Sequence, residues 1–326
     1  MKVLVAAHRM DETDIFNKVN QKFEFEITYK AEKLTEENCQ MVEGYEALAI
    51  NAGCIIDEKM AEYLAGKGVK YILTRTAGFD HMDMKALKRV GIRCANVPAY
   101  SPNAISEHTV LLILSALRKL KEQLRLIEEK YFFITGLRGR ELRSMTVGVI
   151  GAGRIGATTI KNLSGFGCKI LACDAFEKDS VKEYADYVSM EEILEKSDIL
   201  VLHCPMTADN QHLISAEKIS KMKDGVILVN TARGGLVDTE AVLQALKSGK
   251  IAFFAMDVYE HEEMTQRKDF RGKELPDKLL EELLSMDNCI FTSHTAFYTD
   301  EAIENIADIT LTNLYEMSSG QCGNEL

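Results

Sequence analysis

The fold of this chain is decided by a glycine-rich turn near its middle, Gly151-Ala152-Gly153-Arg154-Ile155-Gly156. The turn follows a short apolar run, Thr146-Val147-Gly148-Val149-Ile150, and opens a segment with helical character. Asp174 stands at the end of the next apolar run, residues 169–173. A strand, a tight turn, a helix and a second strand that ends in an acid are typical of a dinucleotide-binding unit. Because this unit begins near residue 146, a separate domain must precede it.

Each of the three glycines is needed at its position for a physical reason. The first permits the tight turn, the second lets the backbone approach a pyrophosphate, and the third lets helix and strand pack closely. The pyrophosphate would lie on the N–H groups of the helix N-terminus. Asp174 can accept hydrogen bonds from both ribose hydroxyls and would repel a 2′-phosphate. The turn alone also fits an ordinary strand–helix connection, but its setting predicts a site for NAD and not NADP.

The composition is typical of a soluble enzyme with two domains. The chain has 326 residues, of which 46% are hydrophobic and 27% charged. A net charge of −11 disfavours nucleic acid and anionic membranes as partners. No apolar run approaches the length of a membrane span, and the first one is too short for a signal peptide. The eight cysteines form no CxxC pair and no metal-ligand spacing, so we expect buried reduced thiols, a cytoplasmic protein and no metal.

Apolar runs and amphipathic segments alternate along the whole chain, which predicts two doubly wound parallel sheets. The strands expected in the first sheet are residues 3–7, 23–29, 47–50, 69–73 and 92–95, with helices at 58–64 and 83–89. The strands expected in the second are 147–150, 169–173, 199–203, 226–230, 252–256 and 289–292.

Two segments mark the boundaries of the domains. Residues 97–102 form a loop punctuated by prolines, in which Ser101 is a good N-cap and Pro102 suits the first helical position. The helix that follows, to about residue 120, is apolar on nearly every face. A long helix at 299–317 leaves no room for a third domain. We therefore expect a first domain of residues 1–100 and 299–326, a dinucleotide domain of residues 101–298, and a substrate in the cleft between them.

Polar residues gather at strand ends of the second domain. Arg233 follows the strand at 226–230, and its planar guanidinium suits bidentate capture of a carboxylate. An acidic stretch, Asp257 to Glu262, follows the next strand, and His294 follows the last. A lone arginine or histidine is often structural. Carboxyl ends of parallel strands meet at one edge, however, which predicts that these groups converge.

Taken together, the motifs resemble those of the NAD-dependent D-2-hydroxyacid dehydrogenases over essentially the whole chain. The resemblance is strongest to the group with D-lactate and D-2-hydroxyisocaproate dehydrogenases, which includes the vancomycin-resistance D-lactate dehydrogenase. The matching stretches are residues 75–78, 97–105, 151–156, 230–234, 255–260 and 294–299. This resemblance implies a Rossmann NAD-binding domain inserted into a discontinuous, flavodoxin-like substrate domain, and commonly a homodimer through the NAD-binding domains.

The resemblance also implies catalytic roles. Arg233 matches the arginine that holds the substrate carboxylate, and His294 matches the acid/base histidine. The glutamate that pairs with this histidine falls on Glu262, although Glu260 and Glu263 are alternatives. In the implied reaction, NADH supplies hydride to a 2-oxo acid while the histidine donates a proton to its carbonyl oxygen. The nearby carboxylate favours the protonated imidazole.

The same resemblance implies the binding residues. Those expected at the cofactor are Gly151, Gly153, Arg154, Ile155, Gly156, Asp174, Cys204, Pro205, Asn210, Thr231, Ala232 and Asp257. Those expected at the substrate are Ala77, Gly78, Tyr100, Arg233 and Tyr298, with the first two acting through backbone N–H groups. The aromatic run 131–133 either reaches the substrate or packs in the core. Small residues at 51–54, where lactate-specific relatives carry a bulky aromatic, indicate room for a branched or aromatic side chain of the substrate.

Other functions stay open at this point. Formate dehydrogenase shares the architecture, but its histidine pairs with glutamine, against which Glu262 argues. An NAD-sensing co-repressor of this fold would keep the same arginine, glutamate and histidine, yet the long disordered tails of a partner-binding role are missing. A 2-hydroxyglutarate, glycerate or phosphoglycerate dehydrogenase is a further alternative, although the last would need extra basic residues for its phosphate.

Overall fold

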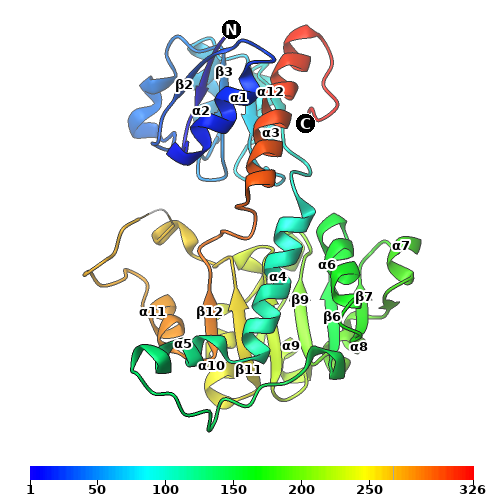
Figure 1. The fold of residues 1–326 in the computed structure, drawn as a ribbon. Helices are drawn as coiled ribbons and strands as arrows, with labels where there is room; N and C mark the ends of the chain where they lie inside the picture. Colours follow the sequence, from blue (N-terminus) through cyan, green and yellow to red (C-terminus); the bar gives the residue numbers. More distant parts are fainter. Residues whose placement is uncertain (267) are drawn as a thin grey trace. The chain divides into compact units, whose positions relative to one another are not determined.

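The computed structural model describes residues 1–266 and 268–326, which divide into two compact units. Unit 1 consists of Met1–Ser101 and Tyr298–Leu326, and unit 2 of Pro102–Phe297. Each unit has its own sheet, and every strand pair within either sheet is parallel (Figure 1). The two doubly wound α/β domains predicted from the alternating pattern are confirmed.

Unit 1 contains a five-stranded sheet in the order β2-β1-β3-β4-β5, which is the flavodoxin-like order. Its strands are β1 (Lys2–Val5), β2 (Glu26–Tyr29), β3 (Ala47–Ile50), β4 (Tyr71–Thr74) and β5 (Arg93–Ala95). Its helices are α1 (Thr13–Asn20), α2 (Glu58–Gly66), α3 (Met84–Arg89) and α12 (Asp300–Ser319). Because α12 is the last helix of the chain, this unit is built from segments at both ends of the sequence, although all five strands of its sheet lie in the first segment.

Alternate side chains of the unit 1 strands face opposite helical layers. Leu4, Leu48 and Ile72 belong to the apolar cluster with α2 and α3. Val3 and Leu73, one residue away along the same strands, belong to the cluster with α12. Both faces are thus buried, as a parallel sheet requires, and the carboxyl edge of the sheet is left for polar loops.

Unit 2 contains a seven-stranded sheet in the order β12-β11-β10-β9-β6-β7-β8. Its strands are β6 (Thr146–Ile150), β7 (Lys169–Cys173), β8 (Asp186–Tyr187), β9 (Ile199–Leu202), β10 (Val226–Asn230), β11 (Ile251–Met256) and β12 (Cys289–Phe291). The chain runs outward from β6 in one direction to β8 and in the other to β12. The order of strands therefore reverses between β6 and β9, which is where open α/β sheets bind ligands.

Helices cover both faces of the unit 2 sheet. On one face α4 (Pro102–Leu117) packs against α6 (Arg154–Ser164), β10 and β11. On the other lie α8 (Met190–Lys196), α9 (Ala216–Lys221), α10 (Thr239–Ser248) and α11 (Lys278–Ser285). The remaining helices are α5 (Leu120–Glu128), directly after α4, and α7 (Asp179–Lys182).

Three expectations need correction. The first strand ends at Val5, because Ala7 has a left-handed backbone with φ +51°. The two-residue strand β8 was not predicted, since it is too short to carry a periodic signal. All eight cysteines are free, but only Cys54, Cys94 and Cys289 are buried. The rest are half-buried, with Cys39 in the 3₁₀ helix Glu36–Val42 and the others at strand ends and in loops.

Candidate active site

The glycine-rich turn joins β6 to α6, and the surroundings of its glycines explain their spacing. Gly151 has φ +94°, and a Cβ there would lie 2.4 Å from the Cys204 backbone nitrogen. A Cβ on Gly156 would lie 1.9 Å from the Gly151 carbonyl oxygen. A Cβ on Gly153 would meet nothing within 4 Å. The first and third glycines are therefore required by the protein itself, whereas the second leaves open space where a pyrophosphate would approach.

The start of α6 suits an anion. Gly153 is its N-cap residue and makes no side-chain capping hydrogen bond, and the positive end of the helix dipole lies at the turn. Asp174 lies beside the turn, where its Oδ2 accepts a hydrogen bond from the Ala152 N–H at 2.6 Å. Its Oδ1 accepts one from the Phe176 N–H at 2.9 Å. A helix N-terminus that opens at Gly153, with a half-buried carboxylate next to it, fits the pyrophosphate and ribose of NAD.

The other residues expected at the cofactor line loops at the same edge of the sheet. Cys204 and Pro205 directly follow β9. Asn210 shapes this loop, because its side chain accepts from the Thr207 N–H at 2.7 Å and donates to the Pro205 carbonyl at 2.8 Å. Thr231 is almost buried after β10, with its hydroxyl 2.9 Å from that of Thr109 on α4. The side chains of Asn210 and Thr231 thus form hydrogen bonds within the protein. A cofactor at this edge would contact the backbone of the loops that they shape.

Arg233 stands in the loop after β10, and Asn230 shapes that loop. The Asn230 amide accepts from the Ala232 N–H at 3.0 Å and donates to the Arg233 carbonyl at 2.9 Å. The Arg233 guanidinium donates to the Ala232 carbonyl at 2.8 Å. A Cβ on Gly234 would lie 2.1 Å from the Tyr259 carbonyl carbon, so this loop packs directly on the loop after β11.

His294 and Glu262 face each other across the loops that follow β12 and β11. The His294 Nδ1 lies 3.1 Å from Glu262 Oε1 and 3.2 Å from Oε2, and both side chains are half-buried. Of the three acids that the sequence left open, Glu262 makes this contact, whereas Glu260 contacts His212. Since Nδ1 faces the carboxylate, the Nε2 atom is the one directed away from it, where a reacting oxygen could be reached.

The backbone of His294 is strained and is held by Asp257. His294 has φ +53°, which is unusual for a residue with a side chain. Its N–H donates to the Asp257 carbonyl at 2.7 Å. The buried Asp257 carboxylate accepts from the N–H groups of Thr295 and Ala296, both at 2.9 Å, and from the Thr292 hydroxyl at 2.6 Å. Asp257 therefore fixes the loop that carries the histidine.

His108 belongs to the same network, and sequence reasoning missed it. It lies on α4 with Nε2 2.8 Å from the Thr292 hydroxyl and 3.6 Å from Asp257 Oδ1. Burial lowers the pKa of His108, against the opposing charge of Asp257. No motif pointed to it, because a polar residue on an apolar helix has no sequence signal for a partner 184 residues away.

The substrate residues expected in unit 1 lie at the carboxyl edge of its sheet. The Thr76 hydroxyl donates to the Gly78 carbonyl at 2.6 Å, and the Asn96 amide donates to the Ala77 carbonyl at 2.7 Å. The bond to the Ala77 carbonyl fixes the peptide plane that carries the Gly78 N–H, and the bond from the Val97 N–H to the Thr76 carbonyl, at 3.1 Å, fixes the plane that carries the Ala77 N–H. The Tyr100 carbonyl accepts from the Asn305 amide of α12 at 2.6 Å.

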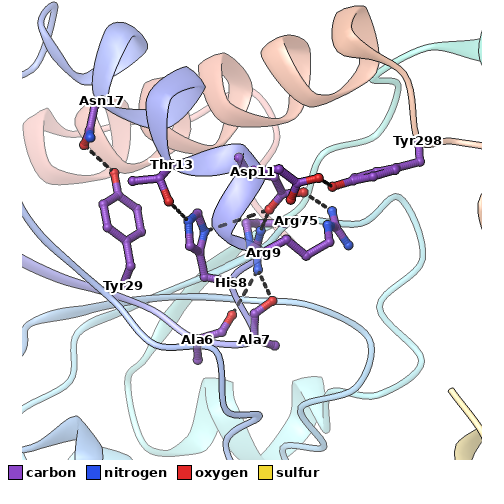
Figure 2. A network of polar contacts seen from close by, with 11 residues as sticks. Ala6, Ala7, His8, Arg9, Asp11, Thr13, Asn17, Tyr29, Arg75 and Tyr298 are labelled. Carbon is purple, nitrogen blue, oxygen red and sulfur yellow. Dashed lines mark hydrogen bonds and ion pairs between the residues drawn. The ribbon is translucent and has the colours of Figure 1, made fainter. Parts of the chain in front are cut away.

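Figure 2 shows a polar network beside these residues. The buried Arg75 donates to the Ala6 and Ala7 carbonyls at 2.9 and 3.0 Å and pairs with the buried Glu12 at 3.0 Å. It thereby ties the segment after β4 to the segment after β1. Burial, and then the Arg75 charge, lower the pKa of His8 to about 4, so this imidazole is neutral at physiological pH.

Tyr298 is part of the same network. Its hydroxyl donates to Asp11, and the Arg9 guanidinium lies 4.6 Å from its ring centroid (Figure 2). Burial and the hydrogen bond to Asp11 raise the pKa of Tyr298 to about 12, so the phenol keeps its proton. Arg9 and Asp11 were not predicted, because they carry no motif and are brought to Tyr298 only by the fold.

Two features are absent from the part of the chain that the structure describes. Among the residues that the structure describes, no cluster of three or more histidine, cysteine, aspartate or glutamate side chains is arranged to hold a metal ion. No helix in residues 1–266 and 268–326 is long and apolar enough to cross a membrane.

Comparison with known proteins identifies similar chains and folds. The family model for the NAD-binding domain of D-isomer specific 2-hydroxyacid dehydrogenases matches residues 110–296. An aromatic 2-oxoacid reductase of Clostridium sporogenes is 42% identical over 100% of this chain and 99% of its own. The apo-structure of D-lactate dehydrogenase from Escherichia coli matches with a TM-score of 0.90 and 35% identity over 100% of both chains. A D-2-hydroxyisocaproate dehydrogenase structure matches with a TM-score of 0.90 and 34% identity, over 100% and 99%.

The glycines allow a paired test of the cofactor site. Gly153→Ala has room for its methyl group within the protein, so we expect a normal melting temperature but an NADH Kd raised about tenfold or more, ~1.4 kcal/mol. Gly156→Ala must displace backbone and should cost about 1–3 kcal/mol of stability. Thermal melts and NADH fluorescence titrations check both. A Gly153→Ala protein that binds NADH as tightly as the parent would contradict the assignment.

Proposed function

Because this chain belongs to the D-isomer specific 2-hydroxyacid dehydrogenases, we propose that Arg233, Glu262 and His294 form the site at which it reduces a 2-oxo acid. The family and the cofactor NAD predicted from the motifs are confirmed. The chain is thus an NAD-dependent oxidoreductase that acts on a CH–OH group. The roles of the individual residues are the proposal, and the contact of His294 Nδ1 with Glu262 carries it.

The histidine acts as acid and base. NADH, when bound, supplies the hydride that reaches the carbonyl carbon of the substrate. His294 donates a proton from Nε2 to the carbonyl oxygen and takes it back in the reverse direction. Glu262 holds the ring through Nδ1, which leaves Nε2 to face the reacting oxygen. Asp257 keeps the loop in place while the ring changes charge.

Arg233 binds and orients the substrate. Its guanidinium can offer two parallel N–H groups to the carboxylate of a 2-oxo acid, which fixes the plane of the molecule. Fixing that plane turns hydride transfer into a reaction between held groups, an effect of positioning. In unit 1 the backbone N–H groups of Ala77 and Gly78, with the rings of Tyr100 and Tyr298, are proposed to contribute to substrate binding.

Replacing the histidine tests the acid/base role. We expect His294→Ala to lower kcat for 2-oxo acid reduction by about 10²- to 10⁴-fold, because general acid catalysis is lost. The Kd for NADH should stay within about twofold of the parent value, because the residue is assigned to proton transfer. Stopped-flow kinetics and fluorescence titration measure the two quantities.

Arg233→Lys is the matched contrast for that variant. A lysine keeps the positive charge but loses the bidentate geometry, so KM for the 2-oxo acid should rise more than kcat falls. The assignment fails if His294→Ala turns over at the parent rate on every 2-oxo acid tried. Turnover by the parent would also exclude a protein that only senses NAD.

The turn after β3 supports a choice of substrate class. We propose a 2-oxo acid with an aromatic or branched side chain, such as phenylpyruvate or 2-oxoisocaproate. In this turn, Asn51 Oδ1 accepts from the Gly53 N–H at 3.0 Å, and Ala52 is exposed at the carboxyl edge of the sheet. The small side chain of Ala52 leaves room for a large substituent. The similar chain named as an aromatic 2-oxoacid reductase supports the same class.

A substrate panel tests this choice. We expect kcat/KM for phenylpyruvate to exceed that for pyruvate by about tenfold or more, since each buried methylene or ring contributes about 1–3 kcal/mol to discrimination. Pyruvate, 2-oxoisocaproate, phenylpyruvate and 2-oxoglutarate form the panel. Ala52→Tyr should reverse the preference towards pyruvate by filling the space. A parent enzyme that favours pyruvate, or 2-oxoglutarate, would refute the proposed class.

The outer face of α5 supports a homodimer through unit 2. Leu120, Leu124 and Ile127 lie at helical spacing and are 39–54% exposed, and α5 buries none of its residues. Its polar side chains hold it to its own unit. Lys121 Nζ donates at 2.6–2.9 Å to three carbonyls, that of Leu284 near the end of α11 and those of Met286 and Cys289 after it. Arg125 pairs with Asp287 at 2.9 Å. The helix therefore presents its apolar side outward.

The segment after α5 extends this apolar surface. Tyr131, Phe132, Phe133 and Ile134 are 45–85% exposed, so the expectation that the aromatic run packs in the core is wrong. Exposed apolar patches of this kind mark association sites. We propose that a second copy of the chain covers this surface.

The eight free thiols support a reducing, cytoplasmic location for the protein.

A charge on this surface should split the dimer. We expect Leu124→Glu to shift the mass of the parent dimer to that of a monomer, because a carboxylate would be buried without a partner. Met10→Glu, at an exposed apolar residue of unit 1, is the control and should leave the mass unchanged. Light scattering after gel filtration measures both. A parent protein that is already monomeric would refute the dimer.

A further inference from the structure

His212 and Glu260 form an ion pair beside the site, outside the groups assigned to the reaction. The His212 Nε2 is hydrogen-bonded to Glu260 Oε1. The other oxygen of Glu260 accepts from the Thr239 hydroxyl at 3.0 Å and from the Thr239 N–H at 3.4 Å. The pair thus joins three segments: the loop after β9, the loop after β11 and the start of α10.

The backbone of His212 is committed to the same junction. His212 has φ +51°, a conformation that residues with side chains rarely adopt without compensating contacts. Its N–H donates to the Gly235 carbonyl at 2.8 Å, and the Ile214 N–H donates to the Leu236 carbonyl at 2.9 Å. The loop after β9 is therefore bonded to the loop after β10 through its backbone and to the loop after β11 through the His212 side chain.

These are the loops that carry the reacting groups. Gly235 is two residues beyond Arg233, and Glu260 is two residues before Glu262. The close packing of Gly234 on the Tyr259 carbonyl leaves no space for an independent shift of either loop. The distance from the arginine to the glutamate and its histidine is consequently set by the contacts at this junction.

We propose that His212 and Glu260 are a positioning pair, which holds the carboxylate-binding Arg233 in register with the Glu262–His294 acid/base pair. The proposal rests on the function assigned to Arg233 and His294. Neither His212 nor Glu260 is assigned to touch the substrate. Their effect on the reaction passes through the loops that they join.

The pair also gives the site a pH dependence of its own. The hydrogen bond to Glu260 raises the pKa of His212, with further contributions from the charges of Glu260 and of Asp238 at the start of α10. A raised pKa means that the contribution of the pair is complete below the ordinary value of 6.5 and is lost as the pH rises through the folded-state value. At alkaline pH the pair should therefore hold the relative position of the loops less firmly.

Two variants remove the pair in different ways. Glu260→Gln keeps the shape and can still accept from Thr239, but it lacks the charge. His212→Asn tolerates the left-handed backbone but is too short to reach Glu260. For each we expect kcat/KM for phenylpyruvate to fall about tenfold at pH 6.5, because a small misplacement of binding groups slows the reaction. The NADH Kd should stay within about twofold, since the coupling passes through Arg233 and the acid/base pair.

The pH profile separates positioning from general stability. The ratio of parent to variant kcat/KM should fall from about tenfold at pH 6.5 towards one at high pH, because the ratio cancels the pH dependence that the acid/base step gives to both proteins. Lys223→Gln is the control, because it breaks an ion pair of similar exposure at the opposite edge of the same sheet. That pair, Lys223 with Asp198, is 40% and 23% exposed, against 40% and 15% for His212 with Glu260. The control should keep the parent profile.

The proposal is overturned if the variants keep kcat/KM within twofold with a profile parallel to the parent, or if Lys223→Gln shows the same loss. If either variant does not fold, Thr239→Val, which removes the hydroxyl that Glu260 accepts from, gives the same readout in milder form. Failure of the proposed function can be distinguished from failure of the positioning pair, because His294→Ala would remain active if the proposed function were wrong. An inactive His294→Ala beside a normal Glu260→Gln would overturn the positioning pair alone.

Discussion

The site depends on one buried carboxylate, that of Asp257. The carboxylate accepts hydrogen bonds from two backbone N–H groups and a hydroxyl of the segment 292–296. The backbone carbonyl of Asp257 accepts a further hydrogen bond from the N–H of His294. These bonds compensate for a left-handed backbone at His294, which would otherwise be unfavourable. Without them, buried polar groups would lose their partners and the histidine would lose its direction. Strain at His294, the residue proposed to transfer the proton, is thus offset by bonds from the end of the neighbouring strand.

The chemistry gathers where it does because parallel strands end at a common edge. Loops after β9, β10 and β11 each bring one part of the proposed site: a wall for the cofactor, Arg233 and Glu262. No loop could hold its side chain alone, since short loops have few internal contacts. They are bonded to each other instead, through Gly234 packing on Tyr259 and through His212 on Gly235 and Glu260. In unit 1 two loops are likewise bonded to each other at the carboxyl edge of the sheet, where the buried Arg75 joins the segments after β1 and β4.

Much of the fold could be read from the sequence. Alternation of apolar runs with amphipathic segments predicts two parallel sheets, and the glycine spacing predicts the turn between β6 and α6. The reason is that these features are local: a Cβ on Gly156 would collide with Gly151, five residues away. The residue types at the strand ends were also readable, because each directly follows an apolar run. The strand β8 escaped prediction, since two residues carry no period.

By itself, the sequence determined the architecture, the family and the set of polar residues from which a site could be built. Only the tertiary structure decided which of them meet. Glu260, Glu262 and Glu263 lie almost side by side along the chain, and the 3₁₀ turn Glu262–Met264 directs Glu262 to His294 while Glu260 turns to His212. His108 and Arg9 reach their partners across distant parts of the sequence. Such contacts arise from the path of the backbone in three dimensions, which leaves no periodic trace in the order of residues.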